Sequence, residues 1–309
     1  VRHAGLLSFG LNCSFGASTL EQFVVELDPA LGCALSFYPN AGLPNEMGQY
    51  DESPQVMGEA IGRIARRGLV NIVGGCCGTS PEHIAAIAGA VAGVSPRALP
   101  EPERVRPSLT VCGLECATID KERSLLTNIG ERTNVAGSRK FARLIAEGAY
   151  DDALQIAAGQ IEGGASIIDI NMDDAMLDSK VEMVKFLRYV SNDPAVAKAA
   201  LMIDSSDFDT VVAGLKNTQG KCIVNSISLK EGEESFLDKA RQIKALGAAV
   251  MVMAFDEEGQ ATSYPRKIDI CARAYRLLTE KLGFAPSDII FDVNVLSIGT
   301  GIEEHARYG

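Results

Sequence analysis

Short apolar runs alternate with amphipathic segments along most of the chain, which is the pattern of a parallel sheet covered by helices. In the first hundred residues this pattern predicts three strands, over residues 4–9, 31–37 and 69–73. The run Ser80-Pro81-Glu82 predicts a helix start, because Ser caps helices and Pro suits the first helical position. We expect that helix over residues 82–91.

A proline-rich segment divides the chain. Residues 95–107 contain four prolines and no apolar period, a composition typical of a linker. We therefore expect one domain over residues 1–94, a Pro-rich linker over 95–123 and a second domain over 124–309. In the second domain six strands separated by helices are predicted, over residues 125–129, 166–170, 200–203, 222–227, 248–255 and 289–293.

Repeated βα units place the chain in the α/β class, as a TIM-type (β/α)8 barrel or as an open doubly wound sheet. The sequence lacks the glycine-rich phosphate loops of nucleotide-binding sheets, which argues against the nucleotide-binding versions of the fold. A barrel needs eight strands, whereas three are predicted before the linker and six after it. Polar residues follow many strands, and in a barrel these strand ends form one ligand-binding rim.

Composition and charge exclude several classes of protein. Hydrophobic residues make up 47% of the chain and charged residues 22%, an ordinary globular balance. The net charge of −11 argues against a nucleic-acid binder, which needs basic stripes. No apolar run approaches the roughly 20 residues that span a bilayer, and no secretory signal begins the chain. We therefore expect a cytoplasmic protein without nucleic-acid or membrane partners.

The spacing of the eight cysteines is more informative than their number, which is too small for a disulfide scaffold. Cys13 follows the first predicted strand, and Cys76 and Cys77 follow the third within a glycine-rich bend. Three thiolates at one sheet edge can bind one zinc ion and leave its fourth position for a substrate. The alternative is a pair of small buried hydrophobes or a vicinal disulfide. The remaining cysteines are interpreted as core (Cys33, Cys222, Cys271) or structural (Cys112, Cys116).

Three motifs carry these cysteines and the strand between them: Gly10-Leu11-Asn12-Cys13, Tyr38-Pro39-Asn40-Ala41-Gly42 and Gly74-Gly75-Cys76-Cys77-Gly78-Thr79. Together they resemble the end of the homocysteine-binding barrel in the cobalamin-dependent methionine synthase family. In that family three cysteines hold zinc, and zinc binds the homocysteine sulfur. The resemblance implies that Cys13, Cys76 and Cys77 are the zinc ligands. Zinc can hold a substrate thiol as the thiolate near neutral pH, which suits this chemistry.

A second series of motifs follows the linker. Its members are residues 127–139, Asp169-Ile170-Asn171-Met172-Asp173, Ile203-Asp204-Ser205-Ser206, Asn225-Ser226-Ile227-Ser228, residues 253–261, Phe291-Asp292-Val293-Asn294 and Thr300-Gly301-Ile302-Glu303-Glu304-His305. The series resembles the pterin-binding barrel of the same synthase family and, more loosely, those of dihydropteroate synthases and corrinoid methyltransferases. One departure is Val293, where the family pattern has Pro; Asp292 is unaffected.

The side chains in this series suit a pterin, whose pyrimidinone edge offers ring N–H and amino donors that a buried carboxylate accepts strongly. We expect Asp204 and Asp292 to bind that edge and Asn225 to be the amide partner. Glu131 and Asn171 are expected on the same rim in support.

By analogy with the family, the turn Gly137-Ser138-Arg139 closes over the ligand, with Arg139 near the carboxylates of the folate. Other interpretations remain open. Asp204 and Asn171 can instead cap the helices that follow them. The acidic runs 173–174 and 256–258 are interpreted as solvated rather than cation-binding, and His83 as a surface residue.

The resemblance covers essentially the whole chain and implies an internal fragment of a methyltransferase. It also implies two TIM-type (β/α)8 barrels, both incomplete in this chain, with about three βα units of the first and six of the second. The methyl group passes from 5-methyltetrahydrofolate through cobalamin to zinc-bound homocysteine, giving methionine. Departure from N5 of the folate needs general-acid assistance, and the sequence assigns no residue to that catalytic role. The Asp-x-His-x-x-Gly pattern of a cobalamin module is absent, so cobalamin is expected on another module of the parent polypeptide or on a separate chain. The alternatives are a non-catalytic pterin- and zinc-binding fragment and a dihydropteroate-synthase-like enzyme.

Overall fold

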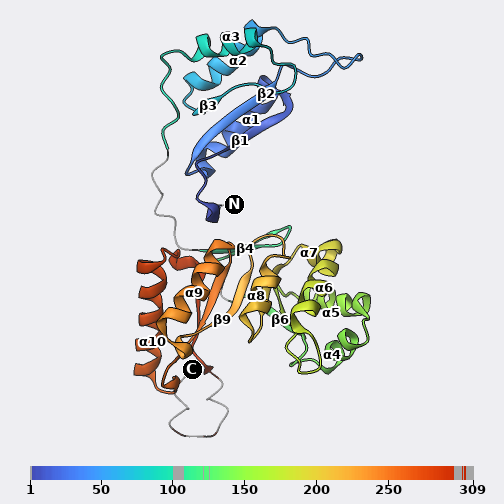
Figure 1. Ribbon diagram of the computed structural model, residues 1–309, viewed down its shortest axis with the longest axis vertical. Coiled ribbons are helices and arrows are strands. Elements are labelled where there is room, and N and C mark those ends of the chain that lie inside the picture. Colours follow the sequence, from blue (N-terminus) through green and yellow to red (C-terminus); the bar gives the residue numbers. More distant parts are fainter. Residues whose placement is uncertain are drawn as a thin grey trace. The chain divides into compact units, whose positions relative to one another are not determined.

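The computed structural model describes residues 2–99, 108–120, 122–124, 126–295, 301 and 303. The chain divides into two units, which we call the N-terminal unit (residues 4–105) and the C-terminal unit (residues 106–309). The division falls within residues 95–123, where the linker is predicted. In each unit, helices accompany a parallel sheet (Figure 1).

The N-terminal unit is built on a three-stranded parallel sheet in the order β1-β2-β3. Leu35 and Phe37 of β2 are fully buried in one core with Met57 and Ile61 of α2. The short helix η1 (Arg2–Ala4) comes first in the chain, and the elements that follow it are β1 (Ser8–Gly16), α1 (Ala17–Leu27), η2 (Asp28–Ala30), β2 (Ala34–Asn40), α2 (Pro54–Arg66), β3 (Ile72–Val73) and α3 (Pro81–Val91). The helix start at Ser80 is confirmed.

The first strand differs from its prediction over residues 4–9. Pairing with β2 begins at Ser8 and continues to Gly16, while Leu7 of the apolar run is 87% exposed. The sequence of β1 lacks a clear apolar alternation because the strand carries the polar residues of a site. The prediction was therefore wrong by several residues.

The C-terminal unit contains the six parallel strands that the pattern predicts, in the order β13-β10-β9-β8-β7-β6. Each strand lies beside its neighbour in the chain, apart from the small hairpin β11–β12 inserted before β13. A doubly wound sheet would reverse this order at a switch point, so the single direction favours the barrel. That the chain holds parts of two incomplete barrels remains a prediction. The strands are β6 (Ile129–Asn134), β7 (Ile167–Asn171), β8 (Ala200–Asp204), β9 (Ile223–Ile227), β10 (Ala249–Met253), β11 (Phe255–Asp256), β12 (Gly259–Gln260) and β13 (Ile289–Asp292).

The two faces of this sheet differ in what covers them. Ile168, Ile170 and Val224, on one face, belong to a large core with the surrounding helices.

No helix among the described residues is long and apolar enough to cross a membrane. The helices are α4 (Arg139–Ala146), α5 (Tyr150–Glu162), α6 (Ser179–Asn192), α7 (Pro194–Ala197), α8 (Phe208–Leu215), η3 (Leu229–Glu231), α9 (Gly232–Ala245), α10 (Tyr264–Arg276), the π-helix η4 (Leu277–Lys281) and η5 (Pro286–Asp288).

The other face is partly covered by a hairpin that lies inside the predicted linker. Strands β4 (Leu109–Cys112) and β5 (Cys116–Ile119) pair in antiparallel fashion, and Val111 is fully buried in a core with Ile167 and Ala200. The prediction of linker up to residue 123 was therefore wrong for this hairpin, whose four-residue strands are too short to show a clear period. The strand predicted over 125–129 is β6, which begins at Ile129; residue 125 lies outside the described residues.

Candidate functional site

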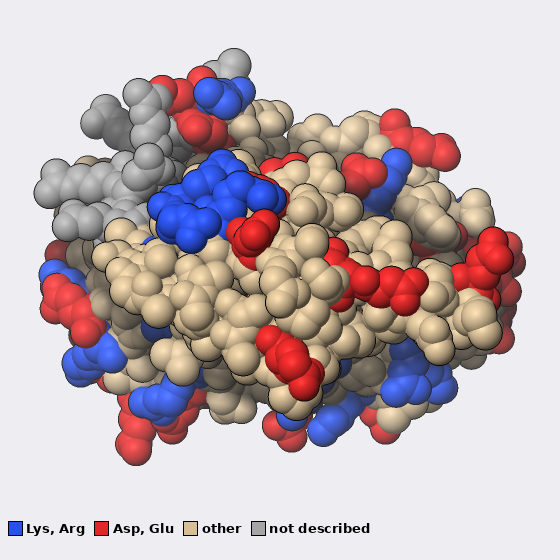
Figure 2. Space-filling view, turned by 90° about the horizontal axis from the view of Figure 1, so that it is seen from above, with Lys and Arg blue, Asp and Glu red and all other residues tan. Residues whose placement is uncertain are grey.

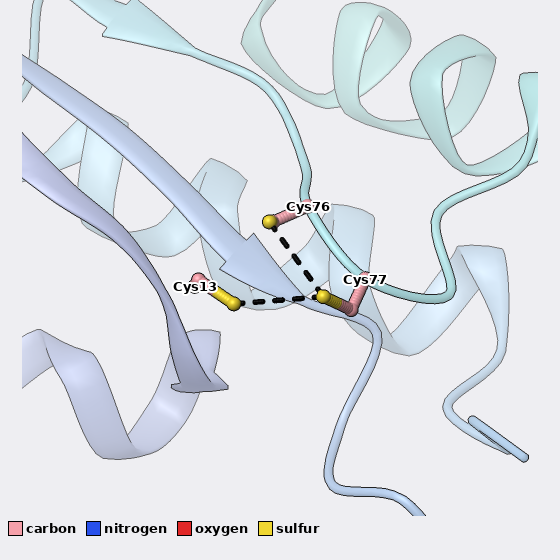
Figure 3. A group of neighbouring side chains, drawn as sticks. All are labelled: Cys13, Cys76 and Cys77. Atoms are coloured by element: carbon pink, nitrogen blue, oxygen red, sulfur yellow. Dashed lines mark hydrogen bonds between the residues drawn. The ribbon is translucent and has the colours of Figure 1, made fainter. Parts of the chain in front are cut away.

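Three cysteine thiols converge at the carboxyl end of the three-stranded sheet (Figure 3). The Sγ atom of Cys77 lies 3.5 Å from Sγ of Cys13 and 3.8 Å from Sγ of Cys76. Within the described part of the chain this is the one group of three or more potential metal-ligand atoms that all lie within 4.8 Å of one another. All eight cysteines are free thiols, so Cys76 and Cys77 form no vicinal disulfide.

The geometry of the three sulfur atoms suits a tetrahedral zinc ion. With zinc–sulfur bonds of about 2.3 Å, two sulfurs of a tetrahedron are about 3.8 Å apart. The separations from Cys77 Sγ to the other two sulfurs, 3.5 and 3.8 Å, are close to that value. The three side chains are half-buried rather than enclosed in a core, which argues against the interpretation as small hydrophobes.

The backbone around the thiols is held by the second of the three sequence motifs. The side-chain Oδ1 of Asn40 accepts a hydrogen bond from the Cys77 amide at 3.1 Å, and Pro39 accepts one from the Cys76 amide at 2.7 Å. Gly78 has a φ of +78°, and a Cβ there would lie 2.3 Å from Cβ of Tyr50. The loop therefore needs glycine at this position.

Hydrogen bonds within the cluster shift the acidity of its members. The pKa of Cys13 is lowered, first by a hydrogen bond from the Ser14 backbone and then by the thiols of Cys77 and Cys76. The pKa of Cys76 is raised, mainly by its hydrogen bond with Cys13. Cys13 therefore forms its thiolate more readily than Cys76. Tyr50, beside Cys77, has a raised pKa through a hydrogen bond to that thiol.

The three cysteines predicted for the core differ in burial. Cys222 is buried, which raises its pKa to about 11, whereas Cys33 and Cys271 are only half-buried.

The prediction that His83 lies at the surface was wrong: it is 7% exposed. Its Nδ1 accepts the Ser80 amide at 3.2 Å, and its Nε2 lies 2.8 Å from the carbonyl oxygen of Glu52. This histidine therefore completes the helix cap that Ser80 begins.

A row of amide and carboxyl side chains crosses four neighbouring strands of the C-terminal unit. Asn134 of β6 is the register partner of Asn171 of β7, which is the partner of Asp204 of β8, which in turn pairs with Asn225 of β9. The structure thus brings three residues predicted for the site, Asn171, Asp204 and Asn225, to one level of the sheet, together with Asn134. The peptide bond after Asn225 is cis.

The sequence analysis missed two residues: Asn134, which belongs to the row, and Asp169, which lies in the layer beneath it. The Nδ2 of Asn134 donates to Oδ2 of Asp169 at 3.3 Å and to Oδ2 of Asp204 at 3.4 Å. Asp169 lies two positions before Asn171 on β7 and is 2% exposed. Strand periodicity carried the signal, because residues i and i+2 share a face.

Burial raises the pKa of both carboxyl groups. The pKa of Asp169 rises to about 7, first through burial and then through the charge of Asp204, while hydrogen bonds from Asn134 and Asn225 oppose the shift. The pKa of Asp204 rises to about 6 through burial, against a hydrogen bond from Asn171. Near neutral pH, Asp204 is therefore mainly ionised and Asp169 is partly protonated. An ionised, half-buried carboxylate beside amides is suited to a ligand rich in N–H donors.

The interpretation of Asp204 and Asn171 as helix caps is wrong. Helix α8 is capped by Asp207, whose side chain accepts from the Thr210 amide at 3.0 Å, and helix α6 is capped by Asp178. The Oδ1 of Asn171 instead accepts from the Asp173 amide, and Asp173 binds Ser205 Oγ at 2.6 Å. These bonds tie together the loops that follow β7 and β8.

The remaining predicted residues lie around this row. Glu131 is exposed on β6, at a register irregularity of that strand. Ser138 caps α4 through the Phe141 amide at 3.3 Å, and Gly137 donates its amide to Oδ1 of Asn134 at 2.9 Å. Arg139 is exposed as the first residue of α4. Asp292 ends β13, where its Oδ1 accepts from the Asn294 amide at 2.8 Å. No described contact joins Arg139 or Asp292 to the row.

The acidic run 256–258 is compensated by arginines. Asp256 pairs with Arg266, and Glu257 binds Arg273 at 2.9 Å. On the face shown in Figure 2, basic side chains lie in separate groups among acidic and uncharged areas. That distribution differs from the continuous basic stripe of a nucleic-acid binder.

Two family models match the chain, one in each unit. A family model described as pterin binding enzyme matches residues 130–309, more than half of the chain. The chain therefore belongs to the pterin-binding enzyme family. A second model, homocysteine S-methyltransferase, matches residues 1–91. The chain thus combines a homocysteine S-methyltransferase domain with a pterin-binding domain.

Similar solved structures include dihydropteroate synthases. The Yersinia pestis enzyme, in a structure with a pterine-sulfa conjugate, is 15% identical with a TM-score of 0.41; the match covers 60% of this chain and 65% of that one. The 7,8-dihydropteroate synthase of Vibrio fischeri ES114 is 14% identical with a TM-score of 0.37, covering 57% and 63%. The chain thus spans less than two thirds of the length of these structures.

Proposed function

We propose that this chain is part of a methyltransferase that makes methionine from homocysteine, with 5-methyltetrahydrofolate as methyl donor and cobalamin as carrier. The N-terminal unit would receive the homocysteine thiol, and the C-terminal unit would bind the folate. The observation that carries the proposal is the convergence of three thiols on a chain that also holds a partly buried row of carboxyl and amide side chains. Cobalamin would come from another module of the parent polypeptide or from a separate chain, and it supplies the carrier for the methyl group.

In the N-terminal unit, Cys13, Cys76 and Cys77 would hold zinc. Zinc, when bound, holds a substrate thiol in its nucleophilic thiolate form near neutral pH. The residues of the chain supply the placement. Asn40 fixes the Cys77 backbone, and the glycines on either side of the cysteine pair leave room for two adjacent side chains to face one point. Three protein ligands leave one coordination position for the substrate sulfur.

In the C-terminal unit, Asp204 would accept the N–H donors of the pterin edge, with Asn225 and Asn171 beside it. Its carboxylate is partly buried, so its hydrogen bonds to a ligand are stronger than they would be in water. Asp292 and Glu131 would complete the contacts, and the turn 137–139 would lie over the bound folate, with Arg139 toward its carboxylates. The proposal leaves the residue that protonates N5 unassigned.

Metal content tests the thiol site. We expect the chain, purified from zinc-containing medium, to hold about one zinc ion, and the double variant Cys76→Ser, Cys77→Ser to lose it, because two of three thiolate ligands are gone. Cys116→Ser, an exposed cysteine of the β4–β5 hairpin, is the matched control and should keep the metal. Equal zinc in the wild type and the double variant would refute the ligand set.

Titration with 5-methyltetrahydrofolate, followed by addition of reduced cobalamin, tests the second half of the proposal. We expect folate binding that Asp204→Asn weakens at least about tenfold, because the amide presents N–H groups to the ligand's own donors. Binding without methyl transfer to cobalamin would favour the non-catalytic fragment. The absence of folate binding would overturn the pterin assignment. Condensation of a pterin with an aromatic amine would instead favour a dihydropteroate-synthase-like enzyme.

A further inference from the structure

We propose that Asp169 is a positioning residue of the pterin site: from the layer beneath the row it anchors the Asn134 amide, and through that amide it places Asp204 and the turn 137–139. This inference rests on the proposed function of the C-terminal unit as a folate site and extends it to a residue that need not touch the ligand. Asp169 shares the inner face of β7 with Asn171 and with Ile167 of the core below.

The hydrogen bonds of Asn134 define the connection. Its two amide hydrogens are directed at Oδ2 of Asp169 and Oδ2 of Asp204, and its Oδ1 accepts from the Gly137 backbone at 2.9 Å. One side chain thus joins two carboxyl groups to the turn that precedes α4. If Asp169 gave no acceptor, the amide of Asn134 could rotate, and both of its other partners would lose a fixed position.

The carboxyl group of Asp169 has a buried oxygen that is free to form a further hydrogen bond. Asp169 is 2% exposed, and its Oδ1 is buried without a hydrogen-bond partner. Among the described residues such buried, unpartnered side-chain oxygens and nitrogens are few, and each calls for an explanation. An unpartnered buried oxygen of this kind can bind a proton or a water molecule.

The charges around Asp169 come from several strands. Asp204 on β8 and Glu131 on β6 both favour its protonated form, while the amides of Asn134 and Asn225 favour the ionised form. When Asp169 is protonated, Asp204 is the one half-buried carboxylate of the row. That carboxylate can accept hydrogen bonds from adjacent N–H donors, of the kind that a pyrimidinone edge presents.

Two substitutions separate anchoring from bulk. Asp169→Asn keeps an acceptor for Asn134 and imitates the neutral acid, whereas Asp169→Leu keeps much of the volume and removes the acceptor. Asp169→Ala, which removes the acceptor with less bulk, is a second variant of the same kind. Asp174→Asn is the matched control, because Asp174 lies on the exposed loop after β7.

The experiment measures 5-methyltetrahydrofolate affinity and hydrogen exchange of the Gly137 amide in the full 309-residue chain. We expect Asp169→Asn to stay within about threefold of wild type in both, and Asp169→Leu to lose about tenfold in affinity and to exchange Gly137 about tenfold faster. Wild-type values in Asp169→Leu, or equal losses in the leucine and asparagine variants, would overturn the inference.

The two measurements distinguish failure of the proposed function from failure of the positioning role. If the wild type binds no folate at all, the proposed function falls, while the exchange of the Gly137 amide still reports whether Asp169 anchors Asn134. If folate binds and the leucine variant leaves both affinity and exchange unchanged, the proposed function stands and the positioning role is wrong.

Discussion

Burial raises the pKa of two aspartates of the C-terminal unit, Asp169 and Asp204. Asp169 and Asp204 lie on the inner side of the sheet, and burial is the largest cause of the raised pKa of each. Asp174, an acid of the same chain region, is exposed. The same residue type is therefore a surface charge at one position and a proton-binding group at another, according to its neighbours in space.

This difference predicts a pH dependence of stability. The folded state raises the pKa of Asp169 from 3.8 to about 7, so its proton stabilises the fold at low pH. That contribution is lost as the pH rises from about 4 to about 7, in total on the order of 4 kcal/mol. Asp169→Asn has no such titration. We expect the free energy of unfolding of the variant, relative to wild type, to rise across this pH window and to level off above pH 8.

Urea unfolding at a series of pH values measures this difference. Asp174→Asn is again the control, because Asp174 is exposed. Parallel curves for Asp169→Asn and wild type would show that Asp169 titrates in the folded chain as it does in the unfolded one.

At the scale of elements, the segment after α3 is fixed to the N-terminal unit by one buried arginine. Arg97 donates through Nε to Asp28 at 2.5 Å and through its other nitrogens to the carbonyl oxygens of Asp28, Leu31 and Cys33. Its side chain is 1% exposed. Although Arg97 lies among the prolines of the predicted linker, it belongs to the packed structure that supports β2.

We expect Arg97→Met to lower the free energy of unfolding of the N-terminal unit by about 3 kcal/mol, because the buried carbonyls and Asp28 would lose their donor. Arg63→Met is the matched control: Arg63 pairs with Glu21 on the surface, with its side chain 52% exposed, and its loss should cost less than about 1 kcal/mol. Denaturant unfolding measures both. Equal effects of the two substitutions would contradict the role assigned to Arg97.

At the scale of the whole molecule, each unit has its own sheet, its own core and its own candidate site. The thiols lie in the N-terminal unit, and the carboxyl–amide row lies in the C-terminal unit. A ligand stabilises the part of a protein whose folded state it binds, by an amount set by its concentration relative to Kd. The two proposed ligands should therefore act on different units.

Calorimetric unfolding of the full chain tests this expectation. We expect a chelator to lower the transition of the N-terminal unit alone and 5-methyltetrahydrofolate to raise that of the C-terminal unit alone. At a hundredfold excess over Kd the folate would add about 2.7 kcal/mol. The double variant Cys76→Ser, Cys77→Ser should abolish the chelator effect and leave the folate effect. One shared transition that both reagents move together would contradict independent units.

Much of the fold could be predicted because strands and helices of a βα unit have strong local signals. The six strands of the C-terminal unit and the helix after Ser80 follow from apolar runs and caps. Elements without such signals were missed or displaced. The hairpin β4–β5 has strands of four residues, and β1 carries polar residues where an apolar pattern would normally mark a strand.

The sequence by itself determined the three cysteines and the order of the βα units, because glycine-rich motifs and apolar periods depend on residues close together in the chain. The tertiary structure decided which residues share a charge environment. Cys13 meets Cys77 across 64 positions, and Asn134 meets Asp204 across 70. Asp169 appears in the sequence as one acid among many. Only the packing of β7 between its neighbouring strands buries Asp169, leaves its Oδ1 without a hydrogen-bond partner and raises its pKa.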